Sequence, residues 1–263
     1  MPKRPRAEAA LLTDDRGRSQ PGCKDYRFYA EERYWDARHN LDEAFEWFAA
    51  PEVLMPLLDL LLAPARLGNA VLDLGCGTSG LLSEMRSAGF SGELTGVDFS
   101  PAAVRCSAAA ARAAHSAADV PAFHCIDASD LSDLVGDGEV GVVVEKATLH
   151  GIVSSPQGEQ LAEKVLKEVH RVLADGGLLV SVSGNSPHSE NEATNGLNVL
   201  EELIIPPLLA AGAETGHYYT VDVHSSESFG PAHAYVLRKV RRARTRSATR
   251  GARFPTAVRL HEH

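Results

Sequence analysis

The chain has 263 residues, of which 44% are hydrophobic, and it carries a formal net charge of −9 at pH 7. This length suits one large domain, and no apolar stretch reaches the ~20 residues that a membrane span needs. The first residues are charged and lack the apolar run of a secretory signal, and the four cysteines show no metal-ligand spacing. These features predict a cytoplasmic protein with reduced thiols, no metal site and no membrane contact.

The charge is unevenly distributed along the chain. Residues 239–263 contain eight Lys or Arg and one Glu, which leaves 18 basic and 34 acidic residues, a net charge of −16, in residues 1–238. An acidic body favours basic partners over nucleic acid. Contact with nucleic acid is therefore expected only through the basic tail, for which a solvated, disordered segment is the favoured alternative.

The chain begins with a polar segment, residues 1–24, that is rich in Arg and Pro and predicts a disordered tail. Residues 25–48 are dense in aromatics, although aromatics make up only 6% of the chain. The apolar spacing of PEVLMPLLDLLLA then predicts a helix over residues 51–63, with Pro51 near its start.

Strand and helix patterns alternate from residue 70 to residue 183. Near-continuous apolar runs predict strands at about 70–74, 93–98, 122–126, 140–145 and 178–183. Between them we expect helices at about 79–88, 100–116 and 158–174. The second begins with Ser100 as N-cap and Pro101 in its first turn, and Gly176–Gly177 marks the end of the third.

The pattern changes after residue 190. A helical stretch is broken at Pro206–Pro207, and two β-patterned runs, HYYTVDVHSS and HAYVLRKV, predict an antiparallel pair. Residues 241–263 form a basic tail that we expect to be disordered. The whole pattern predicts one α/β domain over residues 25–240, with a mostly parallel sheet and helices on both faces.

The stretch VLDLGCGTSG, residues 71–80, places glycines after the first strand. Ligands of open parallel sheets bind beyond the carboxyl ends of the strands. There Gly75 and Gly77 permit a tight turn and let a ligand lie against the backbone. Asp98 ends the second strand, where it can accept hydrogen bonds from ribose hydroxyls, and Asp127 follows the third strand, near an adenine edge.

Asp73 distinguishes between two ligand classes. The spacing Gly75-x-Gly77-x-x-Gly80 also matches the dinucleotide fingerprint, with Asp98 near the expected offset. A carboxylate beside the glycine loop would repel a pyrophosphate. The same carboxylate suits S-adenosylmethionine, which carries a sulfonium and an ammonium group and no phosphate.

Four motifs resemble those of class I S-adenosylmethionine-dependent methyltransferases. They are VLDLGCGTSGL, TGVDFSPAAV, FHCIDASDL and EVHRVLADGGLLVSVS, in that order along the chain. The resemblance implies a Rossmann-like fold and S-adenosyl-L-methionine as cofactor, bound by Asp73, Gly77, Asp98 and Phe99 among others.

A narrower resemblance rests on YWDARH…AFEWF, residues 34–48, and VVVEKATLHGIV, residues 142–153. These stretches are similar to the methyltransferase-like family whose members methylate lysines of translation elongation factor 1-alpha. That family has a seven-stranded, mostly parallel sheet with one antiparallel edge strand. The resemblance implies a protein-lysine N-methyltransferase whose partner is a basic protein such as elongation factor 1-alpha.

The same resemblance assigns residues to the site by position. Trp35, His39 and Trp47 would cover the cofactor, Gly75, Asp98, Asp127 and Ala128 would line it, and Glu145–Lys146 would begin the loop on the substrate side. The chain departs from the family pattern at His39, which replaces Tyr, at Ala147, which replaces Gly, and at His150, which replaces Asp.

Glu145 and His150 are the candidates for orienting or deprotonating the methyl acceptor, because both follow the fourth strand. The alternatives are a carboxylate that caps the loop backbone and a hydrogen-bonded loop histidine. Three other functions remain open: a small-molecule methyltransferase with a lid over residues 185–215, a non-catalytic S-adenosylmethionine-binding protein, and a nicotinamide-dependent oxidoreductase.

Overall fold

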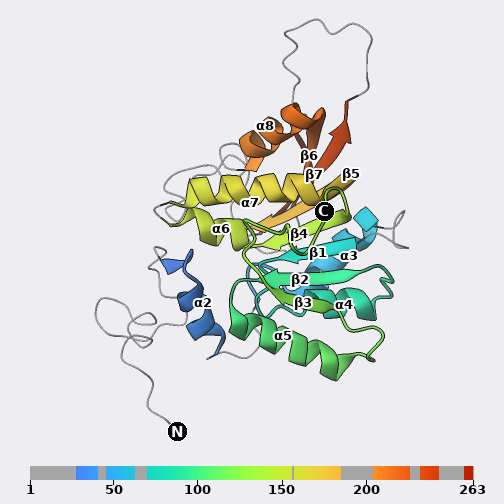
Figure 1. Cartoon of the computed structure of the whole chain (residues 1–263). Helices are drawn as coiled ribbons and strands as arrows, with labels where there is room; N and C mark the ends of the chain where they lie inside the picture. The colour runs from blue at the N-terminus through green and yellow to red at the C-terminus, as the bar shows by residue number, and fades with distance from the viewer. Residues whose placement is uncertain are drawn as a thin grey trace, which may run out of the picture.

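Figure 1 shows the computed structural model, in which one twisted sheet lies between helices. The structure describes residues 28–40, 46–62, 70–155, 157–184, 204–225, 232–242 and 258–262, the last of these by backbone only. The proposed disordered segment 1–24 lies outside these residues. Within the described part of the chain, no helix is long and apolar enough to cross a bilayer.

The sheet has the strand order β3-β2-β1-β4-β5-β7-β6-β8. All neighbouring strands are parallel except β7, which is antiparallel to both β5 and β6. The strands are β1 Ala70–Leu74, β2 Leu94–Asp98, β3 Ala122–Cys125, β4 Val140–Lys146, β5 Leu173–Ser183, β6 His217–Ser225, β7 His233–Arg241 and β8 Val258–Glu262. The first seven form the predicted mostly parallel sheet, with β7 placed between β5 and β6.

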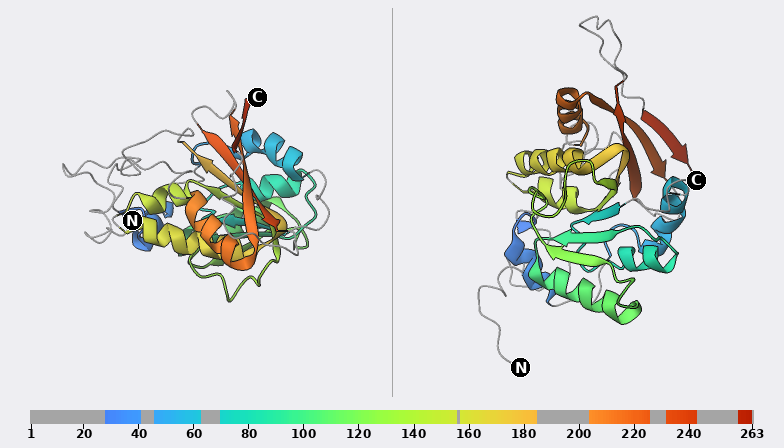
Figure 2. Two further views of the ribbon diagram at one scale, coloured as in Figure 1. Left: turned by 90° about the horizontal axis from the view of Figure 1, so that it is seen from above. Right: turned by 45° about the vertical axis from the view of Figure 1, so that its right-hand side comes forward.

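Helices cover both faces of this sheet, as the views in Figures 1 and 2 show. They are α2 Glu32–His39, α3 Pro51–Leu62, α4 Leu81–Ser87, α5 Pro101–Ala114, α6 Thr148–Val153, α7 Gly158–Val172 and α8 Ile205–Thr215. Leu72 and Leu74 of β1 pack in the core beneath α7 and α8, whereas Val71 packs in the core beneath α3 and α4. Burial of alternate side chains on opposite faces explains why the strands are apolar throughout.

Local sequence signals place the helix starts well. The Ser100 hydroxyl accepts a hydrogen bond from the Ala103 amide at 3.2 Å, and Pro101 opens α5. Ser100 therefore satisfies one of the amides that have no partner in the first turn. Pro51 likewise begins α3. Both helix starts confirm the predictions.

Two predictions in the second half of the chain are wrong. Helix α7 ends at Val172, and Gly176–Gly177 lie within β5, where register shifts between Leu173 and Leu178. Pro206–Pro207 lie in the first turn of α8, where proline fits because no amide partner is needed. Part of the tail expected to be disordered forms β8, which pairs in parallel with β6. The part of the expected helical stretch that precedes these prolines, residues 195–203, lies outside the described residues, so its interruption at Pro206–Pro207 stays a prediction.

A chain of hydrogen-bonded polar side chains fastens α7, β5, α8 and β6 together. His170 contacts the Tyr219 hydroxyl and the Thr215 hydroxyl, both at 2.7 Å. The Thr215 oxygen also contacts His217 at 2.9 Å, and His217 contacts the Asp175 carboxylate at 2.7 Å. Because His170 and His217 are buried, they depend on these partners in place of water.

His170 should make the stability of the protein depend on pH. Burial, together with the nearby charge of Lys239, lowers the pKa of His170 to about 4. The His170 imidazole therefore binds a proton more readily in the unfolded chain than in the folded one. The free energy of unfolding is unaffected by this group above pH ~6.5 and decreases as the pH falls from there toward 4. We expect the loss of melting temperature between pH 7 and pH 5 to be smaller in His170→Asn than in the native protein, by about 2–4 °C. Equal losses in calorimetry would contradict this.

Candidate active site

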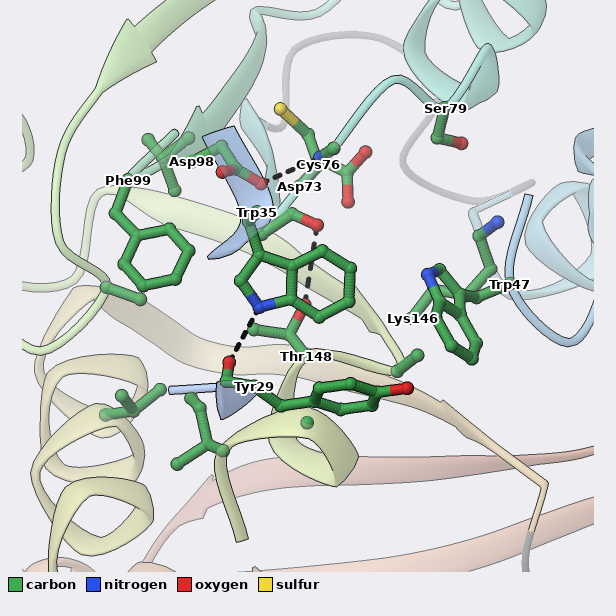
Figure 3. Close-up of a pocket in the computed structure, with 18 of the residues that line it drawn as sticks. Tyr29, Trp35, Trp47, Asp73, Cys76, Ser79, Asp98, Phe99, Lys146 and Thr148 are labelled. Atoms are coloured by element: carbon green, nitrogen blue, oxygen red, sulfur yellow. Dashed lines mark hydrogen bonds between the residues drawn. The ribbon is translucent and has the colours of Figure 1, made fainter. Parts of the chain in front are cut away.

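A pocket lies beyond the carboxyl ends of β1, β2, β3 and β4. Tyr29, Trp35 and Trp47 of the N-terminal segment also line it (Figure 3). Its empty volume is ≈ 1040 Å³, including solvent at the mouth. Every residue predicted to bind the cofactor lines it except Glu145: Trp35, His39, Trp47, Asp73, Gly75, Gly77, Asp98, Phe99, Asp127, Ala128 and Lys146. The topology therefore brings the predicted cofactor site together.

The glycine loop after β1 contains Gly75 and Gly77, and contacts within the protein require glycine there in addition to any need of a ligand. Gly75 has φ +69° and Gly77 has φ +53°, which favour glycine. A Cβ on Gly75 would collide with Thr148, whose hydroxyl donates a hydrogen bond to the Leu74 carbonyl at 2.8 Å. Gly75 is thus needed for the approach of α6 to the loop. A Cβ on Gly77 would lie 3.5 Å from His39.

Asp98 braces this loop and also faces the pocket. Its carboxylate accepts a hydrogen bond from the Gly77 amide at 2.9 Å and another from the Ser100 amide at 2.8 Å. Burial raises the pKa of Asp98, although both backbone hydrogen bonds oppose that shift. Each carboxylate oxygen keeps a second lone pair, so Asp98 can hold the loop and accept hydrogen bonds from a ribose.

Asp73 presents a buried carboxylate to the pocket. Its exposed fraction is 3%, and among the described residues it accepts no hydrogen bond. Burial raises its pKa to about 7; the Lys146 charge lowers it, whereas Glu46, Asp98 and Glu145 raise it. Such a group is costly unless a ligand pairs with it. Asp73 therefore indicates a cationic ligand.

Aromatic rings form the wall that faces the strand ends. Tyr29 and Trp35 lie with ring centroids 5.2 Å apart, Trp35 and Trp47 lie 6.1 Å apart, and His39 stacks on Trp35 at 5.8 Å. The Trp35 indole donates a hydrogen bond to the Tyr29 carbonyl at 2.7 Å. The rings thus support one another, and their π-faces suit a weakly hydrated cation.

Two carboxylates fasten the N-terminal segment, residues 28–40 and 46–50, to the rest of the domain. Glu46 accepts a hydrogen bond from the Gly80 amide at 2.8 Å, at the start of α4. Asp36 accepts one from the Ala102 amide at 2.7 Å, in the first turn of α5. Helix N-termini favour such negative charges. Both contacts hold the aromatic wall over the pocket.

Glu145 and His150 lie outside the pocket lining. The Glu145 carboxylate accepts hydrogen bonds from the Leu149 amide at 3.1 Å and from the Ser181 hydroxyl, and burial raises its pKa to about 7. His150 packs against Phe48 with centroids 5.5 Å apart, and burial lowers its pKa. Its buried Nδ1 has no hydrogen-bond partner among the described residues. Glu145 matches the alternative of a carboxylate that caps the loop.

The sequence did not point to several pocket residues. Thr148 and Gly151 come from α6, a short helix that lacked a clear pattern, and Leu161 and Val165 belong to the apolar face of α7. Their apolar spacing predicted core packing and gave no separate signal for a ligand. Tyr29 lies in the aromatic-rich segment, and that enrichment was the one signal for it.

The pocket suits S-adenosylmethionine better than a dinucleotide. Aromatic faces and the unpaired Asp73 favour a cation, and Asp98 is placed for a ribose. A pyrophosphate beside the glycine loop would meet Asp73 and Glu46, with Lys146 already paired to Glu46. The residues present therefore fit a phosphate-free cationic nucleoside.

Comparison with known proteins gives the same result. The sequence profile of the family described as "Methyltransferase domain" matches residues 66–226. The chain belongs to this family. The predicted class I fold and the predicted cofactor, S-adenosyl-L-methionine, are thereby confirmed, and the oxidoreductase alternative is removed.

Two individual proteins of known name are similar to this chain over much of its length. The chain is 33% identical over 171 residues to EEF1A lysine methyltransferase 4 of Bos taurus, covering 61% of this chain and 63% of that protein. It is 34% identical over 184 residues to the Mus musculus protein of the same name, covering 65% and 68%. The chain thus spans about two thirds of the length of these curated relatives.

One solved structure shows the shared fold. Phosphoethanolamine N-methyltransferase 2 of Haemonchus contortus, in complex with phosphomonomethylethanolamine and S-adenosylhomocysteine, superposes with a TM-score of 0.56 at 13% identity. The match covers 83% of this chain and 60% of that one. At this identity it supports the architecture alone.

Asp98→Ala should weaken binding of S-adenosylhomocysteine by about 1.5–3 kcal/mol, the scale of lost hydrogen bonds to a charged group. The variant loses the ribose acceptor and one brace of the glycine loop. Isothermal titration calorimetry measures the change, and Asp130→Ala, in an exposed carboxylate outside the pocket, is the matched control. Unchanged affinity in Asp98→Ala would contradict the assignment.

Ala147→Gly should stabilise the protein by about 0.5–1 kcal/mol. Ala147 has φ +70°, a left-handed conformation that is strained for alanine and free of strain for glycine. Ala147→Val should destabilise the protein because a β-branched side chain tolerates this conformation worse. Chemical denaturation measures both changes in the free energy of unfolding. If Ala147→Val were more stable than the native protein and Ala147→Gly less stable, the backbone at position 147 would not be strained.

Proposed function

We propose that this protein transfers the methyl group of S-adenosylmethionine to a lysine side chain of a basic protein such as elongation factor 1-alpha. The unpaired Asp73 beneath an aromatic wall is the observation that supports the donor half of the reaction. The names of the cow and mouse relatives and the acidic body of the chain support the acceptor half.

When bound, the cofactor supplies a methyl group whose departure leaves a neutral thioether, so no acid is required at the leaving group. The protein contributes alignment and exclusion of water. Trp35 and Trp47 close one side of the pocket, and Asp73 fixes the polar end of the donor. Asp98 fixes its ribose end, so the donor has little freedom to rotate.

The acceptor must present a neutral amine. A lysine with a pKa near ~10.4 is almost wholly protonated at pH 7. Burial next to a sulfonium lowers this pKa, because desolvation and like charge both disfavour an ammonium. In this proposal the proton leaves to water and needs no dedicated side-chain base.

Glu145 then has a positioning role. Its two hydrogen bonds fix the turn from Lys146 into α6, which forms part of the pocket wall. His150 is neutral at pH 7, because burial lowers its pKa below the ordinary value. It therefore offers no charge to a lysine, and in this proposal it packs beside Phe48 near the acceptor side.

The experiment incubates the protein with tritiated S-adenosylmethionine and a lysate of its source organism, followed by mass spectrometry of the labelled fraction. We expect label on lysine of an abundant basic protein. The Asp98→Ala variant is the control, because its weakened cofactor site should reduce the label. Label confined to the small-molecule fraction would establish the metabolite alternative instead. No transfer despite cofactor binding would indicate a non-catalytic binding protein.

A further inference from the structure

Glu46, Asp73 and Lys146 form a group of charged side chains at one side of the pocket. Lys146 makes an ion pair with Glu46. Asp73 pairs with Val144 of β4, and Lys146 follows two residues later, so the side chains of Asp73 and Lys146 leave the same face of the sheet and both line the pocket. Among the described residues that line the pocket, Lys146 is the only Lys or Arg. One ammonium group is thus available to two carboxylates.

The pairing is the opposite of the one that burial alone would favour. Asp73 is 3% exposed, whereas the Glu46 side chain is 25% exposed. A buried carboxylate gains more from a cation than a partly hydrated one does. Lys146 would therefore be expected on Asp73, and its position on Glu46 needs a cause.

The contacts of Glu46 supply that cause. The Gly80 amide donates to one of its oxygens at 2.8 Å, and the Ser79 hydroxyl donates to the other at 2.9 Å. These bonds hold the carboxylate at the start of α4, where the helix dipole favours it. Because the Glu46 side chain is already fixed by these bonds, its pairing with Lys146 costs it little further conformational entropy.

We infer that Glu46 is a positioning residue that holds Lys146 away from Asp73, so that the Asp73 carboxylate stays free for the ammonium group of the cofactor. This rests on the cofactor half of the proposed function and is independent of the methyl acceptor. Removal of Glu46 would release Lys146 to pair with Asp73, and the lysine would then compete with the ligand for the same carboxylate.

The charges around Asp73 give the inference a pH signature. Lys146 and Glu145 approach from β4, Asp98 from β2 and Glu46 from the N-terminal segment. With the pKa of Asp73 raised to about 7, a cationic ligand should bind more tightly as the pH rises through this value and Asp73 ionises. An Asp73 paired with Lys146 would ionise at lower pH.

The test titrates S-adenosylhomocysteine, which carries the same ammonium group, into the full chain between pH ~5.5 and pH ~8.5. In Glu46→Gln we expect the midpoint of the affinity change to fall by about one pH unit, because Lys146 then stabilises ionised Asp73. Affinity at pH 8 should fall about 10-fold, because the lysine competes with the ligand.

The double variant Glu46→Gln with Lys146→Met separates this role from loop support. With the competing cation removed, the midpoint should return toward the native value, and affinity at pH 8 should recover to within about 3-fold of native. If Glu46 only supported the loop, removal of Lys146 would not restore binding. An unmoved midpoint in Glu46→Gln, or no recovery in the double variant, would overturn the inference.

Ser79→Ala is the matched control. It removes the Ser79 contact of Glu46 but keeps the Glu46 carboxylate, its hydrogen bond from the Gly80 amide and its ion pair with Lys146, so the midpoint pH should stay at the native value. If Glu46→Gln melts below the assay temperature, Glu46→Asp provides the same comparison, with a smaller shift in the same direction. These readouts concern binding, so they are unaffected by failure of the lysine-labelling experiment.

Discussion

The cofactor site depends on which carboxylate one lysine pairs with, among those that meet at the carboxyl ends of the parallel strands. Parallel strands place their carboxyl ends together, so Asp73, Asp98 and Glu145 converge although they are far apart in the chain. Buried charges of one sign are costly unless they find partners. Backbone amides satisfy Asp98, an amide and a hydroxyl satisfy Glu145, and Lys146 pairs with Glu46. Asp73 is left for a cationic ligand.

The N-terminal segment serves two purposes through neighbouring residues. Its aromatic rings close the pocket, and its carboxylates Asp36 and Glu46 satisfy amides at the starts of α5 and α4. Those starts border the glycine loop and the end of β2, where the donor must bind. The segment thus couples the pocket wall to the helices whose positions shape the cofactor site.

The sequence predicted what depends on local chemistry. Apolar runs located β1 and β2, Ser100 located the start of α5, and strand ends located Asp73 and Asp98. The sequence did not predict contacts between residues that are far apart along the chain. Glu46 contacts Gly80 and Lys146, which are far from it in the sequence, and the need for glycine at position 75 arises from Thr148. Gly176 and Gly177 fit either the end of a helix or an irregular strand, and the local signal alone favoured the helix end.

A crystal structure of the protein with S-adenosylhomocysteine tests the central claim most directly. The account predicts the ligand ammonium within hydrogen-bonding distance of the Asp73 carboxylate, the ribose hydroxyls on Asp98, and Lys146 still paired with Glu46. A ligand whose ammonium lies away from Asp73, with Lys146 occupying that carboxylate instead, would contradict it.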